Sequence, residues 1–199
     1  MKKKFLVTVS LTAAIILSIF ASQFSAFSKE CELIRKNTLR LHIIAASDTE
    51  EDQNLKLMVR DRILDEWGGI FLNSGSAEET IEIAKENIEG FLATANSVLE
   101  ENGKSCKLSC EIVNMFFENR IYGDVTMPAG RYNAVRIIIG EGKGENWWCV
   151  LFPPLCISSC TEKIKDEDML DPVRGDSKSL KAKLWVVEAF QYIKEKILG

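Results

Sequence analysis

The chain has 199 residues, of which 46% are apolar and 27% are charged, and its formal net charge at pH 7 is −4. This composition is typical of a folded globular protein and excludes an intrinsically disordered one. The length predicts one domain and is sufficient for a sizeable hydrophobic core.

The N-terminus has the pattern of a secretory signal. Three lysines precede the apolar run Phe5–Ala21, and a short run of small and polar residues follows it. Cleavage is expected after Ala26 or Ser28. The alternative is an uncleaved membrane anchor, for which the apolar run is slightly short. We therefore expect residues 1–28 to be a signal peptide or membrane anchor, and residues 29–199 to form a single exported domain.

Export changes the charge balance. Residues 1–28 contain three of the 25 basic residues and no acidic one, so 22 basic and 29 acidic residues remain, a net charge of −7. An acidic surface disfavours nucleic acid and anionic lipid as partners. We expect no nucleic-acid partner, and a membrane contact only through the N-terminal segment if that segment is uncleaved.

The first part of the exported chain predicts one strand and two helices. Leu39–Ala46 is short and apolar, which indicates a buried strand. The acidic segment 47–52 has capping-box spacings and should begin a helix, which is expected to end or loosen at Gly68-Gly69. After a turn at residues 73–76, an apolar stripe from Ile81 to Leu99 predicts a second helix.

The second part predicts three strands and a final helix. Strands are expected at Lys107–Phe117, Arg131–Ile139 and Trp147–Phe152, with Gly140–Asn146 as the flexible tip of an antiparallel hairpin between the last two. The final helix should span roughly Leu180–Leu198. This order predicts an α+β domain with a small, mostly antiparallel sheet and helices packed on it.

Two groups of residues could support catalysis, and each has a simpler explanation. His42 is the only histidine, so any Ser-His-Asp or Cys-His site would need it. It lies inside a predicted buried strand, where a hydrogen-bonded structural histidine is the simpler interpretation. Asp48, Glu50, Glu51 and Asp52 could bind a cation or act as paired acids, but a solvated helix start explains them. We expect no catalytic residue, no metal and no cofactor.

The six cysteines suggest disulfides, because their number is even and the chain is predicted to be exported. The alternative to disulfides is a zinc site, which requires four ligands. Four of the cysteines could provide them: Cys106, Cys110, Cys156 and Cys160. On one strand Cys106 and Cys110 would be about 13 Å apart, too far for a bond between them. They would need partners elsewhere, and Cys156 and Cys160 are candidates if the two segments run side by side. Cys149 and Cys156 could instead close the turn at Pro153-Pro154. The sixth cysteine is Cys31.

The run from Gly140 to Cys156, GEGKGENWWCVLFPPLC, is the most unusual part of the chain. Its adjacent tryptophans should point to opposite faces of their strand, one into the core and the other outward or under a helix. An exposed tryptophan beside a loop is a candidate hot spot for protein binding, and packing in the core alone is the alternative. The expected contact surface combines this run with the predicted helix start: Asp48, Glu51, Asp52, Lys143, Asn146, Trp147 and Trp148.

Three segments resemble the stage II sporulation protein R family. They are Leu39–Leu64, with LRLHIIAASDTEEDQNLKLMVRDRIL, Tyr122–Arg131, with YGDVTMPAGR, and the run Gly140–Cys156. The resemblance implies a protein exported from the forespore into the intermembrane space. There it would activate a membrane-embedded aspartic peptidase, which cleaves the precursor of sigma-E. The resemblance further implies that the chain is not an enzyme, and that the family's cysteine pair is Cys149 and Cys156.

Two other functions compete with this one. The first is an exported hydrolase that uses Cys149 or Cys156 with His42. The second is a structural envelope protein stapled by disulfides. An activator of a peptidase has a protein partner and no small-molecule substrate, which distinguishes it from the hydrolase.

Overall fold

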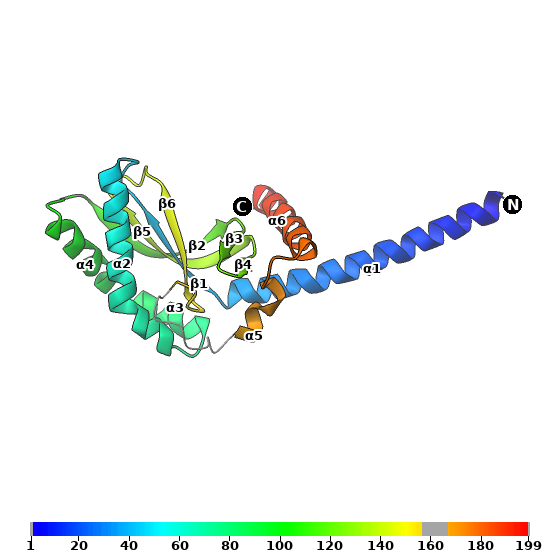
Figure 1. Cartoon of the computed structure of the whole chain (residues 1–199), viewed down its shortest axis with the longest axis horizontal. Helices are drawn as coiled ribbons and strands as arrows, with labels where there is room; N and C mark the ends of the chain where they lie inside the picture. The colour runs from blue at the N-terminus through cyan, green and yellow to red at the C-terminus, as the bar shows by residue number, and fades with distance from the viewer. Residues whose placement is uncertain (1, 157–166, 199) are drawn as a thin grey trace.

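A four-stranded sheet lies between two layers of other elements in the computed structural model, which describes residues 2–156 and 167–198 (Figure 1). One central pairing is parallel and the two outer pairings are antiparallel. The predicted α+β class and the mostly antiparallel sheet are confirmed. The strands lie in the order β2 (Leu108–Phe117), β5 (Gly130–Ile139), β1 (Leu39–Ile44) and β6 (Asn146–Phe152).

The predicted hairpin between the last two strands is wrong. β1 lies between β5 and β6, parallel to the first and antiparallel to the second. The physical reason is the burial of β1 on both faces: Leu39, Arg40, Leu41, His42 and Ile43 are all buried. A strand that is covered on both faces belongs in the middle of a sheet.

The loop between β5 and β6 crosses the end of β1 and is not a free tip. Lys143 and Gly144 donate backbone hydrogen bonds to the carbonyl oxygens of Ala46 (3.3 Å) and Ala45 (3.0 Å). A Cβ on Gly144 would lie 2.2 Å from the carbonyl oxygen of Ser47, so only glycine fits there. The loop is therefore packed against the segment that leads into the next helix.

Three helices cover one face of the sheet: α2 (Glu50–Asn73), α3 (Ala77–Glu86) and α4 (Ile88–Glu101). The start of α2 was predicted, and its N-cap is Thr49, whose hydroxyl accepts a hydrogen bond from Asp52 N (3.3 Å). α2 does not end at Gly68-Gly69, because its next turn buries Phe71 in the core. The predicted second helix is two helices, since the side chain of Asn87 caps α3 on the carbonyl oxygen of Ile83 (2.7 Å).

The other face is covered by the C-terminal part of α1 (Lys2–Lys36), by α6 (Lys178–Leu198) and by a small hairpin of β3 (Arg120–Tyr122) and β4 (Val125–Met127). The short α5 (Glu167–Leu170) and the 3-10 turn η1 (Asp171–Val173) complete this layer. The hairpin was not predicted, because strands of three residues are too short to show a reliable alternation.

α1 has two parts with different surroundings. Its N-terminal part projects from the domain (Figure 1), and an 18-residue window with mean hydropathy 2.2 has no buried residue. By length and composition this part could cross a membrane, which fits a signal or anchor segment. The C-terminal part buries Phe27, Cys31 and Ile34 against the sheet layer. The predicted boundary at residue 28 thus falls inside a continuous helix, and cleavage there stays a prediction.

Candidate functional site

The two segments predicted to form a contact surface lie side by side at one end of the sheet. The backbone N–H of Glu145 donates to Asp48 Oδ1 (2.7 Å), and Lys56 Nζ donates to the carbonyl oxygen of Glu145 (3.0 Å). Lys56 is buried, so it joins α2 to the loop from within. We call this region the sheet-end surface and define it by the exposed residues Asp48, Glu51, Lys143 and Asn146.

The charged residues of the sheet-end surface are mostly paired on the surface itself. Glu51 forms an ion pair with Lys104 (2.8 Å), and Lys143 forms one with Glu141 (2.6 Å). Asp52 is half-buried and accepts a hydrogen bond from Ser47 Oγ (2.5 Å), so it stabilises the helix start. Exposed pairs of this kind contribute little to stability, which leaves them available to a partner.

Asn146 connects this surface to a buried stack on the face that α1 and α6 cover. His42 Nε2 donates to Asn146 Oδ1 (2.7 Å), and the imidazole lies on the ring of Trp148 with centroids 3.8 Å apart. Nδ1 of His42 has no hydrogen-bond partner among the described residues. Burial lowers the pKa of His42 to about 4, so the ring is neutral at pH 7. This is a structural histidine, which is the simpler of the two sequence interpretations.

The two tryptophans do point to opposite faces of β6. Trp147 packs beside the α2–α4 core, with the Arg60 guanidinium 5.1 Å from its ring. Trp148 packs on the other face, where its ring meets His42 and Phe117. Both are half-buried, because each face of the sheet is covered. Neither tryptophan is a freely exposed anchor, so each would reach a partner only at its uncovered edge.

A disulfide joins Cys149 to Cys156, with a Cα–Cα distance of 6.0 Å, and closes the turn that contains Pro153-Pro154. Cys31, Cys106 and Cys110 form no disulfide with any described residue, and Cys160 lies outside the described residues. Because Cys156 is bonded, the suggested four-thiolate zinc site would lack one ligand. No group of three or more metal-ligating side chains occurs within residues 2–156 and 167–198.

The structure does not assemble a Cys-His pair. The side chain of His42 lies in the layer of Phe117 and Trp148, whereas Cys149 belongs to the core on the α2–α4 face. The sheet therefore separates the imidazole from this sulfur, and both candidate sulfurs are bonded to each other. A nucleophile and its base must be within hydrogen-bond reach, a condition that these residues do not meet.

Sequence reasoning missed a buried arginine. Arg40 is fully buried in β1, and its guanidinium lies over Phe117 (4.1 Å), Tyr132 (5.0 Å) and Tyr122 (5.6 Å). Nη2 donates to the hydroxyl of Tyr122 (2.6 Å), while Nε and Nη1 have no partner in the described part of the chain. Burial lowers the pKa of Arg40. The available signal was an arginine that, like His42, interrupts the apolar residues of the strand.

The segment Tyr122–Arg131 contributes one of the three rings around Arg40, that of Tyr122, and lies between the other two in the sequence. Tyr122 ends β3, and Gly123 adopts a φ of 60° in the turn to β4. At the other end Arg35 of α1 donates to the carbonyl oxygen of Ala129 (3.1 Å). A Cβ on Gly130 would lie 2.6 Å from the Arg35 side chain. The segment therefore fixes α1 and the β3–β4 hairpin on one face of the sheet.

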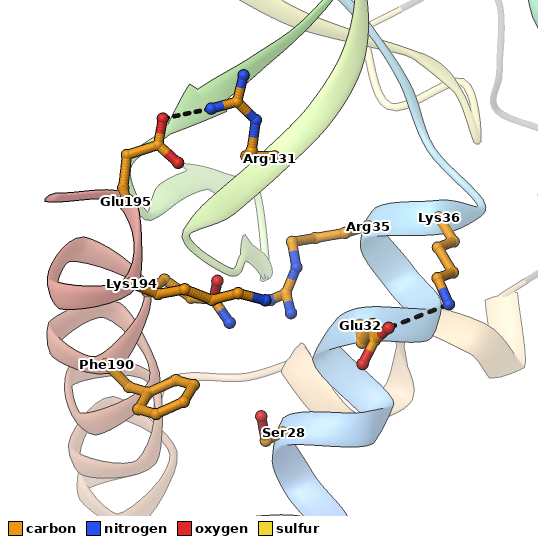
Figure 2. Close-up of a pocket in the computed structure, with 9 residues that line it drawn as sticks. Ser28, Glu32, Arg35, Lys36, Arg131, Phe190, Lys194 and Glu195 are labelled. Atoms are coloured by element: carbon orange, nitrogen blue, oxygen red, sulfur yellow. Dashed lines mark hydrogen bonds and ion pairs between the residues drawn. The ribbon is translucent and has the colours of Figure 1, made fainter. Parts of the chain in front are cut away.

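A hollow of about 660 Å³ lies between α1, α6 and β5 (Figure 2). Arg131 pairs with Glu195, Glu32 pairs with Lys36 (3.0 Å), and Arg35 and Lys194 point into the space between the helices. Ligand pockets are typically apolar and enclosed, whereas this hollow is open and charged. We interpret it as the joint between α1 and α6. It is lined by Ser28, Glu32, Arg35, Lys36, Arg131, Phe190, Gln191, Lys194 and Glu195.

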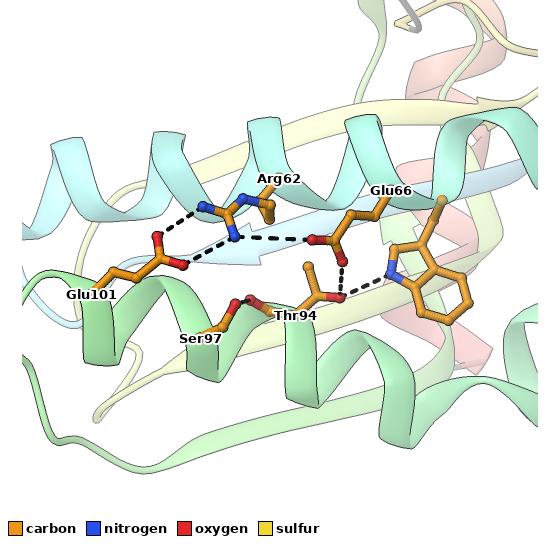
Figure 3. Close-up of polar contacts among 6 residues, drawn as sticks. Arg62, Glu66, Thr94, Ser97 and Glu101 are labelled. Atoms are coloured by element: carbon orange, nitrogen blue, oxygen red, sulfur yellow. Dashed lines mark hydrogen bonds and ion pairs between the residues drawn. The ribbon is translucent and has the colours of Figure 1, made fainter.

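A polar network on the opposite face holds α2 to α4 (Figure 3). Arg62 forms a bidentate pair with Glu101 (2.8 and 3.2 Å). Thr94 donates to Glu66 (2.6 Å) and accepts from Trp67 Nε1 (3.1 Å). All of these groups bond to one another across the two helices, so the network explains helix packing and presents no site.

Comparison with known proteins agrees with these motifs. The family model of stage II sporulation protein R matches residues 35–162. The stage II sporulation protein R of Bacillus subtilis (strain 168) is 34% identical over 138 residues, which cover 68% of this chain and 62% of the relative. The chain belongs to the stage II sporulation protein R family. No solved structure matches it.

The stage II sporulation protein R match includes the whole sheet. It begins at Arg35, in the last turn of α1, and includes the sheet-end surface, the cover of Arg40 and the Cys149–Cys156 disulfide. It ends before α6 begins at Lys178. The family core is thus the sheet with α2–α4 and the β3–β4 hairpin.

Proposed function

We propose that this protein is an exported signalling protein of sporulation, which activates a membrane-embedded aspartic peptidase and so causes processing of the sigma-E precursor. It acts by binding and is not itself an enzyme. Membership of the stage II sporulation protein R family supports the link to sporulation. The exposed apolar part of α1 supports export from the forespore into the intermembrane space.

The observation that best supports activation by contact is the position of the sheet-end surface. β1 leads away from the C-terminal end of α1, and the sheet-end surface lies at the far end of that strand (Figure 1). If α1 enters or adjoins one membrane, this surface faces away from that membrane. A partner in the opposite membrane would then meet the sheet-end surface first.

Activation by binding requires only a preference for one state of the peptidase. A ligand that binds the active arrangement more tightly shifts the population toward it. Moving the balance from about 1:99 to 99:1 takes roughly 5.5 kcal/mol of differential affinity. An interface of ordinary size can provide that difference. No proton transfer or nucleophile from this chain is needed, in keeping with a neutral His42 and bonded cysteines.

The test is co-expression of the full chain with the peptidase and the sigma-E precursor in a non-sporulating host. We expect precursor cleavage only when all three are present. Equal cleavage without this chain would overturn the proposal. A structural envelope protein predicts that equal result, and a hydrolase predicts cleavage without the peptidase.

The contact surface is tested by charge reversal at exposed positions. Lys143→Glu and Glu51→Lys alter the sheet-end surface without disturbing the core, because both side chains pair only with other surface residues. We expect each to lower cleavage at least tenfold. The matched control is Lys85→Glu on α3, which breaks a similar exposed pair with Glu82 and should have no effect. Equal activity of all three variants would place the contact elsewhere.

A further inference from the structure

α6 is apolar on two faces, and only one of them is covered. Leu180, Leu184 and Val187 are buried against the layer of α1 and the β3–β4 hairpin. A second apolar stripe with helical spacing lies roughly 130° around the helix from the buried face and is exposed, and Trp185 (68% exposed) and Tyr192 (53% exposed) lie beyond one edge of it. We define the α6 stripe as Ala182, Val186, Phe190, Ile193 and Ile197.

The charges that α6 presents to solvent are positive. The helix contains five lysines and two glutamates. Both glutamates bond inward: Glu188 accepts from Asn119 N and Nδ2 (3.3 and 2.7 Å), and Glu195 pairs with Arg131. The lysines are exposed, and one of them, Lys181, pairs with Asp176 just before the helix (2.6 Å). The exposed charge of this helix is therefore positive, whereas the net charge of the exported chain as a whole is negative. Its lysines are Lys178, Lys181, Lys183, Lys194 and Lys196.

The α6 stripe continues the exposed apolar surface of α1. Phe190 packs edge-to-face on Phe24 with ring centroids 6.0 Å apart, and Lys183 lies over the ring of Phe27 (5.4 Å). Phe24 is three residues beyond the apolar run Phe5–Ala21. Figure 1 shows α6 crossing near α1 just where the projecting part of that helix ends. A bilayer that surrounds the apolar run would therefore reach the α6 stripe.

We propose that the α6 stripe binds the surface of an anionic lipid bilayer next to the segment that enters it. An apolar stripe flanked by lysines and aromatic residues is the pattern of a helix that lies in the headgroup region. The lysines are attracted to anionic headgroups, and Trp185 and Tyr192 lie at the boundary with the acyl chains. This departs from the expectation of membrane contact through the N-terminal segment alone. It is independent of the proposed peptidase partner.

The proposal predicts that Trp185 contacts lipid. The full chain is reconstituted into phosphatidylglycerol–phosphatidylcholine vesicles with brominated acyl chains, and only protein that floats with the vesicles is measured. The chain has four tryptophans, so the emission of Trp185 is obtained by subtracting that of Trp185→Phe. We expect bromine near the headgroup to reduce it at least twofold. The emission of Trp148, obtained from Trp148→Phe, should not change.

A charged variant tests the stripe itself. Val186→Glu with Ile193→Glu should abolish the quenching of Trp185, whereas Ile121→Glu, at a more exposed apolar residue of β3, should not. Trp185 that is unquenched at every bromine depth would overturn the proposal. Concentration-dependent cross-linking through α6 would overturn it as well, and would show that the stripe binds a second copy of this chain. Equal quenching in pure phosphatidylcholine vesicles would overturn the assignment to an anionic surface.

Discussion

The two faces of the sheet contain different kinds of core. Toward α2–α4, β1 presents Leu41 and Ile43 to a cluster that is almost entirely aliphatic and aromatic. Toward α1 and α6, the same strand presents Arg40 and His42, which are surrounded by aromatic rings. The first face is stabilised mainly by removal of apolar area from water. The second must also compensate buried polar groups, so its stability depends on contacts from distant segments.

The difference also separates two roles. The α2–α4 face lies wholly inside the family match, and it positions the start of α2 in the sheet-end surface. The other face fixes the helix that projects from the domain, through Arg35 and the β3–β4 hairpin. One face thus supports the proposed contact surface, and the other connects the domain to the proposed membrane segment. Four substitutions or conditions test how far the two faces differ.

The largest expected effect is on the apolar face. Leu41→Ala should lower the free energy of unfolding by about 3 kcal/mol, because it leaves a cavity in a fully buried cluster. Leu41→Met, which nearly conserves volume, should cost less than about 1.5 kcal/mol. Both are measured by urea unfolding of the full chain in detergent. Equal losses for the two variants would show that this core is not closely packed.

The next effect is a pH dependence that belongs to the polar face. The pKa of His42 is about 4 in the folded protein and about 6.5 when unfolded, so the unfolded chain binds the extra proton first. The contribution of His42 to stability is complete above about pH 6.5 and should fall by about 3 kcal/mol as the pH is lowered to 4. His42→Phe keeps a ring on Trp148 and should remove this part of the slope. An unchanged slope in the variant would contradict the shift.

A smaller effect is expected from the network between α2 and α4. Thr94→Val removes both hydrogen bonds of the hydroxyl, to Glu66 and from Trp67, at nearly constant volume. The expected cost is about 1 kcal/mol, because the exposed Glu66 and the half-buried Trp67 can bond to water instead. Thermal unfolding followed by circular dichroism measures it, with Thr94→Ser as the control that retains the hydroxyl. A cost above about 3 kcal/mol would mean that this network, and not apolar packing, holds the layer.

The smallest change is expected at the buried cation. Arg40→Met should alter the free energy of unfolding by no more than about 1 kcal/mol, because the lost contacts with Phe117 and Tyr122 are offset by the removed cost of burying a charge. Urea unfolding measures the difference. A loss as large as that of Leu41→Ala would make Arg40 a main source of stability, and the two faces would then be energetically alike.

Local features of the fold could be predicted from the sequence. The four strands of the main sheet and the start of α2 follow from alternation and capping chemistry between near neighbours. The order of strands could not be predicted, because β1 pairs with residues that follow it by about 100 positions, such as Asn133 and Phe152. The glycine-rich loop between β5 and β6 favours a hairpin when only local sequence is considered. The structure differs because β1, which is buried on both faces, lies between these two strands.

The same limit applies to the candidate site. The sequence singled out the start of α2 and the run after Gly140, but their contact through Asp48 depends on the strand order. The cover of Arg40 was missed because Phe117, Tyr122 and Tyr132 follow it by 77 to 92 positions. The spacing of the cysteines alone left the disulfide partner of Cys149 open. The resemblance to the family identified Cys156 as that partner.

The position of β1 also determines when the sheet can form. A chain that crosses a membrane from its N-terminus delivers β1 early, while its two neighbours begin only at Gly130 and Asn146. Loop closure over such distances is slow, and the central strand has no backbone partner until they arrive. If the chain is exported as proposed, the sheet is therefore completed only after most of the polypeptide has been translocated, and it stays unformed while a secretion channel threads the chain.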